Sequence, residues 1–301
     1  MTAPVRSSAA SLPEPVFNEL LWGDSVRLFA FGKPYDWSLR PYTDQATEEE
    51  LRGLAPSTFL PNIALQYGLG KILYAPSPRL FNAEVATEAE VMKTEVRLTS
   101  KEFSNTVWLR RGANADGLVL SAGSSYVVSP AGCPIIIMHD ERAGVVGVAH
   151  AGLRSLFDEG AIEGKKPRAH ESVVMSLLEA MRKHGVQDMR RVEIVIAFPI
   201  DPKDFTYPWD HPVYGELNRK RTEELVRLWG EGAILNYRSP NARKLGRPDL
   251  VAIIRKQCTS LGVPLWKTRV INSPPDRAWH HTRQGSNNML RNLVLVHHLY
   301  R

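Results

Sequence analysis

The stretch AGCPIIIMHDERAGVVGVAHAGLRS, residues 131–155, sets the architecture that the chain can adopt. Two short apolar runs flank the turn DERAG at residues 140–144, a pattern that predicts an antiparallel β-hairpin. Cys133 begins the first run and His150 ends the second. Counted outward from a turn centred near Arg142, these two residues are nine and eight positions away. We therefore expect the thiol and the imidazole to face each other at one end of the hairpin.

A thiol beside an imidazole forms either part of a metal site or an ion-paired nucleophile. The alternative is a small core cysteine and an unrelated histidine at a strand end. The residues that follow, HAGLR, favour a site. Small residues and Arg154 before a predicted helix offer backbone N–H groups and a guanidinium to an anion or a developing oxyanion. Cys258 lies on the apolar face of a predicted helix, so we expect it to be buried and inert.

The pattern along the chain predicts the α+β class, with mixed β-sheets in a sandwich-like core and helices outside it. Besides the hairpin, strands are expected at residues 26–32, 94–99, 105–111, 116–122, 124–130, 190–200, 233–238, 265–271 and 291–299. Helices are expected at residues 47–55, 171–185, 214–230 and 247–262. Residues 56–95 show no clear pattern.

The composition indicates one sizeable globular domain, since 43% of the 301 residues are hydrophobic and 23% are charged. We expect residues 1–15, rich in Ala, Ser and Pro, to form a disordered tail and residues 16–301 to form a single domain. The two cysteines lack the spacing of a disulfide framework, and no apolar run is long enough to span a membrane. A cytoplasmic location is therefore expected. The net charge of +6 comes from short scattered basic groups, which argues against nucleic acid as a partner.

Three segments resemble the laccase-domain family, also called multicopper polyphenol oxidase or YfiH-like. They are NADGLVLS at 114–121, AGCPIII at 131–137 and VVGVAHAGLRS at 145–155, against A-D-[AG]-L-V, D-C-x-P and V-A-x-A-H-A-G-W-R-G in the family. The resemblance lies mainly in residues 105–301 and implies a single laccase-like α+β domain. It also implies a purine nucleoside enzyme that carries out phosphorolysis and deamination. The family's site combines a His-Gly histidine, the D-C cysteine and the H-A-G histidine and can hold zinc, which makes Cys133 and His150 the implied catalytic residues and metal ligands.

The chain departs from the family pattern within this site. Where the family has Q-V-H-G, the chain reads NTVWLRRGANADG at residues 105–117, which contains no histidine. The third zinc ligand of the family is therefore not found, and two protein ligands rarely hold zinc firmly. Gly132 also replaces the Asp before the cysteine, and Leu153 replaces the Trp of H-A-G-W-R.

The closing segment HHTRQGSNNMLRNLVLV, residues 280–296, resembles the family's S-Y-R-R-D-G…G-R segment. The resemblance implies that Arg283 and Arg291, together with Arg154, bind a substrate or anion, because each guanidinium can donate a planar fork. His281 is well placed to join the site if this segment packs on it. His297 and His298, farther along, are expected at the surface beside the last strand.

These observations leave three functions open. The first is a family enzyme that acts on a purine nucleoside or a related small molecule, with zinc as a possible cofactor. The second is a metal-free cysteine hydrolase or deamidase, in which His150 deprotonates Cys133 and backbone N–H groups stabilise the oxyanion. The fold also resembles that of deamidating toxins, which use such a dyad. The third is a non-catalytic descendant that binds a ligand through the same cleft.

Overall fold

The computed structural model describes residues 12–43, 45–77, 83–91, 95–100, 105–281 and 290–300. Their strands are β1 (Phe17–Leu21), β2 (Val26–Phe31), β3 (Ile72–Tyr74), β4 (Val85–Ala86), β5 (Glu95–Ser100), β6 (Asn105–Arg110), β7 (Gly117–Leu120), β8 (Ser125–Val128), β9 (Ile135–Asp140), β10 (Val145–His150), β11 (Glu193–Ala197), β12 (Thr268–Ile271) and β13 (Leu293–His298). Within this described part, seven strands form one sheet in the order β1-β2-β13-β8-β3-β6-β5, and six form another in the order β12-β11-β9-β10-β7-β4. Both sheets mix parallel and antiparallel pairs, as the predicted α+β class requires.

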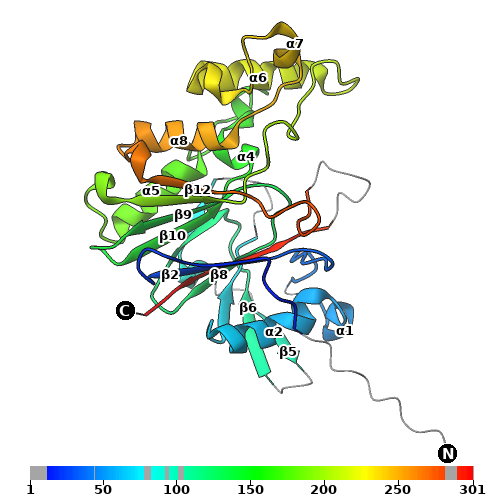
Figure 1. Cartoon of the computed structure of the whole chain (residues 1–301), viewed down its shortest axis with the longest axis vertical. Coiled ribbons are helices and arrows are strands. Elements are labelled where there is room, and N and C mark those ends of the chain that lie inside the picture. The colour runs from blue at the N-terminus through cyan, green and yellow to red at the C-terminus, as the bar shows by residue number, and fades with distance from the viewer. Residues whose placement is uncertain are drawn as a thin grey trace, which may run out of the picture.

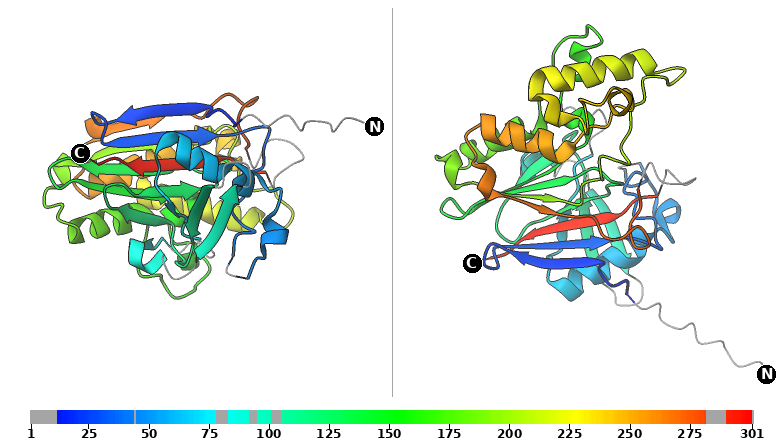
Figure 2. Two further views of the ribbon diagram at one scale, coloured as in Figure 1. Left: turned by 90° about the horizontal axis from the view of Figure 1, so that it is seen from below. Right: turned by 45° about the horizontal axis from the view of Figure 1, so that its top comes forward.

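Helices cover the outer faces of the two sheets. In the described residues they are α1 (Glu48–Leu51), α2 (Ala55–Tyr67), α3 (Glu88–Val91), α4 (Leu153–Leu156), α5 (Val173–Lys183), α6 (Gly215–Trp229), α7 (Pro240–Lys244) and α8 (Leu250–Ser260). Figure 1 shows α5 and α8 over the six-stranded sheet, α2 beneath the seven-stranded sheet, and α6 and α7 farthest from the sheets. The layers are therefore helix, sheet, sheet and helix. The two views in Figure 2 show β13 beside β2, near the opposite end of the chain.

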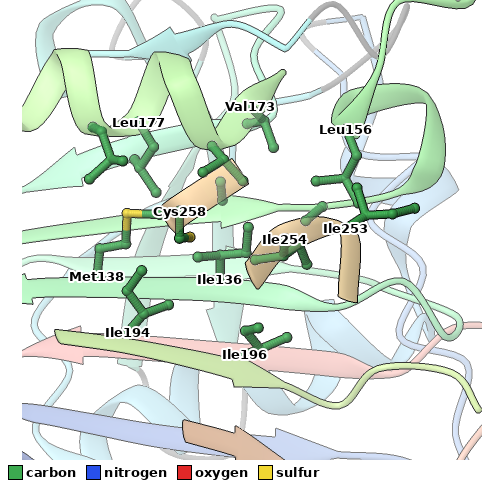
Figure 3. Packing of buried hydrophobic residues seen from close by; sticks show 14 of the residues in the cluster. Ile136, Met138, Leu156, Val173, Leu177, Ile194, Ile196, Ile253, Ile254 and Cys258 are labelled. Atoms are coloured by element: carbon green, nitrogen blue, oxygen red, sulfur yellow. The ribbon is translucent and has the colours of Figure 1, made fainter. Parts of the chain in front are cut away.

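Three apolar layers hold this arrangement together. One lies between the six-stranded sheet and helices α5 and α8, a second between the two sheets, and a third between the seven-stranded sheet and α2. Because strand side chains alternate between faces, β9 sends Ile136 and Met138 toward the helices and Ile135 and Ile137 toward the other sheet. Figure 3 shows the first layer from close by, with Cys258 of α8 packed among aliphatic side chains, as predicted.

The predicted hairpin is confirmed. Strands β9 and β10 pair antiparallel, with His150 opposite Ile135 and Val145 opposite Asp140. The ladder continues for one further bond, from the N–H of Ala151 to the carbonyl of Pro134. It carries the hairpin to Cys133, which lies two residues before Ile135.

The predicted helices at residues 171–185, 214–230 and 247–262 are confirmed as α5, α6 and α8. The start of α5 is explained by Ser172, whose hydroxyl accepts a hydrogen bond from the N–H of Met175. The predicted strand at 233–238 is wrong. The structure has a 3-10 turn at Glu231–Ala233 and an isolated bridge from Ile234 to Pro248 there.

His297 and His298 are buried, so their expected surface position is also wrong. The Nδ1 atom of His297 lies 2.9 Å from the Ser125 hydroxyl, and that of His298 lies 3.1 Å from the Leu120 carbonyl. Both side chains contact residues of other strands, Ser125 of β8 and Leu120 of β7, which explains why they are enclosed. Much of the predicted tail, residues 1–11, lies outside the described residues. Where the chain is described, it contains no helix that is both long and apolar enough to cross a membrane.

Candidate functional site

A cavity of about 280 Å³ opens where the two sheets meet at the Cys133 end of the hairpin. The six-stranded sheet contributes Cys133, just before β9, and His150, the last residue of β10. The rest of the lining comes from segments that enter or leave strands of the seven-stranded sheet: Leu39, Arg40, Pro76, Ser77, Arg111, Val127, Val128, Ser129, Pro130, Ala131 and Arg291. The site thus draws on both sheets.

Cys133 and His150 come together over Gly152. The hairpin register places both on the face that points toward the seven-stranded sheet, since His150 pairs with Ile135 and Cys133 lies two residues farther along. A Cβ atom on Gly152 would lie 3.3 Å from Cys133 Sγ, 3.2 Å from His150 Cε1 and 3.7 Å from His150 Nε2. The sulfur and the Cε1–Nε2 edge of the imidazole therefore flank one small space that only a glycine leaves open.

Asp116 lies behind the imidazole and completes a Cys-His-Asp arrangement. It is the residue before β7, the strand beside β10, and it is fully buried. Its Oδ1 atom lies 3.6 Å from His150 Nδ1 and accepts a hydrogen bond from the Ser155 hydroxyl, and its Oδ2 atom accepts one from the N–H of Ala83. The Asp116 carbonyl also accepts the N–H of His150, at 2.8 Å. The carboxylate and its own backbone therefore fix the position of the ring.

Sequence reasoning did not assign a role to Asp116. A signal was present: an acid directly precedes the buried run GLVL, and a buried carboxylate requires a partner. The local pattern does not say that this partner is His150, because the two residues meet only through the pairing of β7 with β10.

The surroundings of His150 favour its charged form. Burial lowers its pKa, but the charge of Cys133, hydrogen bonding to Asp116 and Cys133 and the charge of Asp116 together raise it to about 10. An imidazolium is therefore held between a carboxylate and a sulfur at neutral pH. A histidine next to a thiol in this way can serve as its acid–base partner.

Three arginines line the same cavity. Arg40 follows β2 and is exposed, Arg111 follows β6 and is half-buried, and Arg291 precedes β13 and is buried. Arg111 Nη2 donates to the Ser77 hydroxyl at 3.2 Å. Of the three, the sequence indicated only Arg291. Arg111 belongs to the segment 105–117, where the family resemblance implied a histidine.

The other predicted site residues have different positions. Arg154 is not part of the described cavity lining, since its side chain is 62% exposed and its Nε atom pairs with Glu159 at 3.0 Å. The expectation that it faces the cleft is therefore corrected. Its first-turn position in α4 directs it to the surface, whereas His150 ends the strand that faces inward. Arg283 lies outside the described residues.

His281 lies on the other side of the cysteine loop. Its Nδ1 atom would be 3.5 Å from a Cβ on Gly132, and its Nε2 atom lies 3.5 Å from an Asp276 oxygen. Gly132 has a φ angle of +112°, which favours glycine and turns the chain sharply into Cys133. His281 is thus a neighbour of the cysteine loop and is not among the described residues that line the cavity.

The residues present do not fit a firmly held zinc ion. Cys133 and His150 supply two donors, and Asp116 faces the far nitrogen of the imidazole. Among the described residues, no group of three or more His, Cys, Asp or Glu side chains could hold a metal. Guanidinium groups, which repel a cation, line the cavity where a further donor is needed.

Comparisons with known proteins agree with this fold. The family model described as multi-copper polyphenol oxidoreductase laccase matches residues 79–274. The fold is similar to that of YlmD from Geobacillus stearothermophilus, with a TM-score of 0.61 and 17% identity over 91% of this chain and 92% of that chain. It is also similar to the hypothetical protein YfiH of Bacillus licheniformis, with a TM-score of 0.59 and 15% identity over 91% and 93% of the two chains. For the Neisseria meningitidis protein NMB0706 the TM-score is 0.56 at 13% identity, over 92% and 95%. No curated protein sequence matches the chain significantly.

Proposed function

Since the chain belongs to the multi-copper polyphenol oxidoreductase laccase family, and since its site departs from a zinc site, we propose that it is a metal-free cysteine hydrolase. Its substrate is a small molecule with an amide or a related carbon–nitrogen bond, so the reaction is a deamidation. The observation that carries the proposal is the meeting of Cys133 and His150 over Gly152, with Asp116 behind the imidazole. Nucleophile, acid–base group and carboxylate then follow one another in the order of a catalytic triad, with Asp116 Oδ1 3.6 Å from His150 Nδ1.

The reaction starts from the thiolate–imidazolium pair. The Cys133 sulfur attacks the carbonyl carbon, the S–C bond forms, and the C=O electron pair moves to the oxygen. As this intermediate collapses, the C–N bond breaks and His150 gives its proton to the leaving nitrogen. Ammonia departs and a thioester remains on Cys133.

Water completes the cycle. The neutral imidazole of His150 takes a proton from water, whose oxygen attacks the thioester carbon. The C–S bond breaks, and the thiolate and imidazolium are restored. The net reaction converts an amide and water into a carboxylate and ammonium. The positive charge of the cavity lining stabilises the oxyanion in both steps.

The test is ammonia release from a panel of small primary amides by the purified full-length chain, before and after treatment with a chelator. We expect turnover that survives chelation and is absent in Cys133→Ala and His150→Ala. Activity that chelation removes and zinc restores would overturn the metal-free mechanism. A protein that binds ligands but turns over none of the amides would support the non-catalytic alternative.

A purine nucleoside enzyme is the second candidate, and the cavity arginines favour it, because a guanidinium binds phosphate as well as carboxylate. Phosphorolysis requires inorganic phosphate as the second substrate, whereas deamination and deamidation require water. Adenosine and inosine are therefore assayed with and without phosphate beside the amides. Release of a free base that depends on phosphate would favour this candidate over the hydrolase.

A further inference from the structure

We propose that Ser155 is a positioning residue of the site, whose hydroxyl holds the carboxylate of Asp116 where it orients the imidazole of His150. Ser155 follows HAGLR in the sequence, at the point where the family pattern H-A-G-W-R-G has a glycine, so the family pattern does not supply this hydroxyl. The proposal rests on the proposed function for the roles of Cys133 and His150. The contacts that carry it do not depend on which substrate binds.

The Asp116 carboxylate is fully buried and needs hydrogen-bond donors in place of water. Its two oxygens have different neighbours. Oδ2 accepts the N–H of Ala83 at 3.0 Å, whereas Oδ1 accepts the Ser155 hydroxyl at 2.9 Å and lies 3.6 Å from His150 Nδ1. Ser155 and His150 therefore meet at the same oxygen.

The bond from Ser155 fixes the direction of the carboxylate. A distance of 2.9 Å is that of a good hydrogen bond, whereas the 3.6 Å to His150 Nδ1 is longer than one. The N–H of Ala83 holds one oxygen only and leaves the carboxylate able to turn about its Cβ–Cγ bond. The second bond, from Ser155, opposes that rotation and keeps Oδ1 facing the ring.

Ser155 is itself held in place at the start of α4. It is fully buried, and its N–H donates to the Gly152 carbonyl at 2.9 Å. The start of α4 thus carries both Gly152, over which the two reacting side chains meet, and the hydroxyl that binds Asp116. One hydrogen bond therefore joins this turn to the residue before β7.

Ser155 is not among the described residues that line the cavity, so it reaches the reaction through its neighbours. Loss of its hydroxyl should lower kcat and leave KM nearly unchanged, since substrate contacts are retained. The same loss should slow the alkylation of Cys133, because the imidazole beside the sulfur loses its fixed orientation.

Alkylation by iodoacetamide tests the role of Ser155 without knowledge of the substrate, since the reagent forms a bond from sulfur to carbon and releases iodide. The rate at Cys133 is followed by peptide mass spectrometry in the wild type, Ser155→Ala, Asp116→Asn and the double variant. We expect Ser155→Ala to slow the reaction by about 3- to 10-fold. In the Asp116→Asn background it should change the rate by less than about 2-fold, because the oxygen through which Ser155 acts is altered.

Ser125→Ala is the matched control for the loss of a buried hydroxyl. Ser125 is also fully buried, and its hydroxyl donates to the Leu69 carbonyl at 2.8 Å, away from the cavity lining. The control should lower the urea midpoint as Ser155→Ala does but leave the alkylation rate unchanged. Ser155→Gly, which introduces the residue of the family pattern, removes the hydroxyl in a second way and replaces Ser155→Ala if that variant does not fold.

The outcomes for the two proposals are distinct. Slower alkylation in Ser155→Ala, with little further effect in the Asp116→Asn background, supports the positioning role even if no amide is turned over. A rate equal to or above that of the wild type, or the same fold-loss in both backgrounds, overturns it even if turnover is found. A loss of kcat/KM that comes from a higher KM would also overturn it, because Ser155 would then act on substrate binding.

Discussion

The two cysteines of this chain occupy opposite kinds of surroundings. Cys258 lies on α8 among the aliphatic side chains between that helix and the six-stranded sheet, where it is fully buried (Figure 3). Burial raises the pKa of its thiol to about 12. Cys133 lines the cavity between the sheets, partly exposed and beside His150, whose pKa is raised. A cysteine is thus part of the inert apolar core in one place and a candidate nucleophile in the other.

The difference shows that reactivity follows from neighbours and access. An apolar layer stabilises the neutral thiol of Cys258 and excludes reagents. At Cys133 the strand end leaves an opening, and His150, fixed by Asp116, supplies a positive charge. The predictions below test this contrast.

The largest effect is expected from removing each sulfur in turn. Cys133→Ala should abolish turnover, a loss of at least about 10³-fold in kcat, because no other group replaces the nucleophile. Its stability to urea should stay close to that of the wild type, since the residue is partly exposed. Cys258→Ala should retain kcat but lose about 1 to 2 kcal/mol of stability through the small cavity it leaves in the core. Equal loss of activity in both variants would contradict the contrast.

The second effect concerns the charge beside Cys133. His150→Ala should slow the alkylation of Cys133 by iodoacetamide at pH 6.5 by about 10-fold or more, because the sulfur loses the positive charge of the imidazole beside it. In the wild type, Cys258 should remain unmodified over the same period. Peptide mass spectrometry follows both thiols in one sample. Alkylation of Cys133 at the same rate in wild type and variant would show that His150 does not activate Cys133.

Part of this contrast could be predicted from sequence. Apolar runs around a turn located the β9–β10 hairpin, and counting along it brought Cys133 and His150 together. The four-residue spacing of apolar side chains on α8 predicted the burial of Cys258. Such features depend on neighbours within one hairpin or one helix, so the local pattern contains them.

The remainder of the site depends on contacts between distant segments. Asp116 reaches His150 only because β7 pairs with β10, and Arg40 and Arg111 reach the cavity only because the two sheets pack together. Nothing local distinguishes these arginines from the other basic residues. The helix α2 was missed for a related reason: Pro61 lies inside it, and its packing on β5 and β6 outweighs the cost of the proline.

A third, moderate effect is expected from Asp116→Asn. Asp116 raises the pKa of His150, so its removal lowers that pKa below the value of about 10. If the imidazolium protonates the leaving nitrogen, activity falls as the pH rises through the pKa of His150. The alkaline limit of kcat should therefore move to lower pH in the variant, by about one unit. If kcat were lower at every pH but its alkaline limit were unchanged, the carboxylate would have a purely structural role.

The smallest effect is expected from a methyl group placed between the two reacting side chains. Gly152 has φ and ψ angles of −64° and 159°, which alanine adopts without strain, so the backbone should tolerate Gly152→Ala. The new methyl would lie 3.2 Å from His150 Cε1 and 3.3 Å from Cys133 Sγ, closer than an ordinary van der Waals contact. The ring and the sulfur must then move apart by a few tenths of an ångström. We expect kcat and the iodoacetamide rate at Cys133 to fall by about 3- to 10-fold, because catalysis is sensitive to such displacements.

Gly232→Ala is the matched control, since a Cβ there meets no atom within 4 Å. Equal rates for both variants and the wild type would mean that Cys133 and His150 do not act across the space above Gly152.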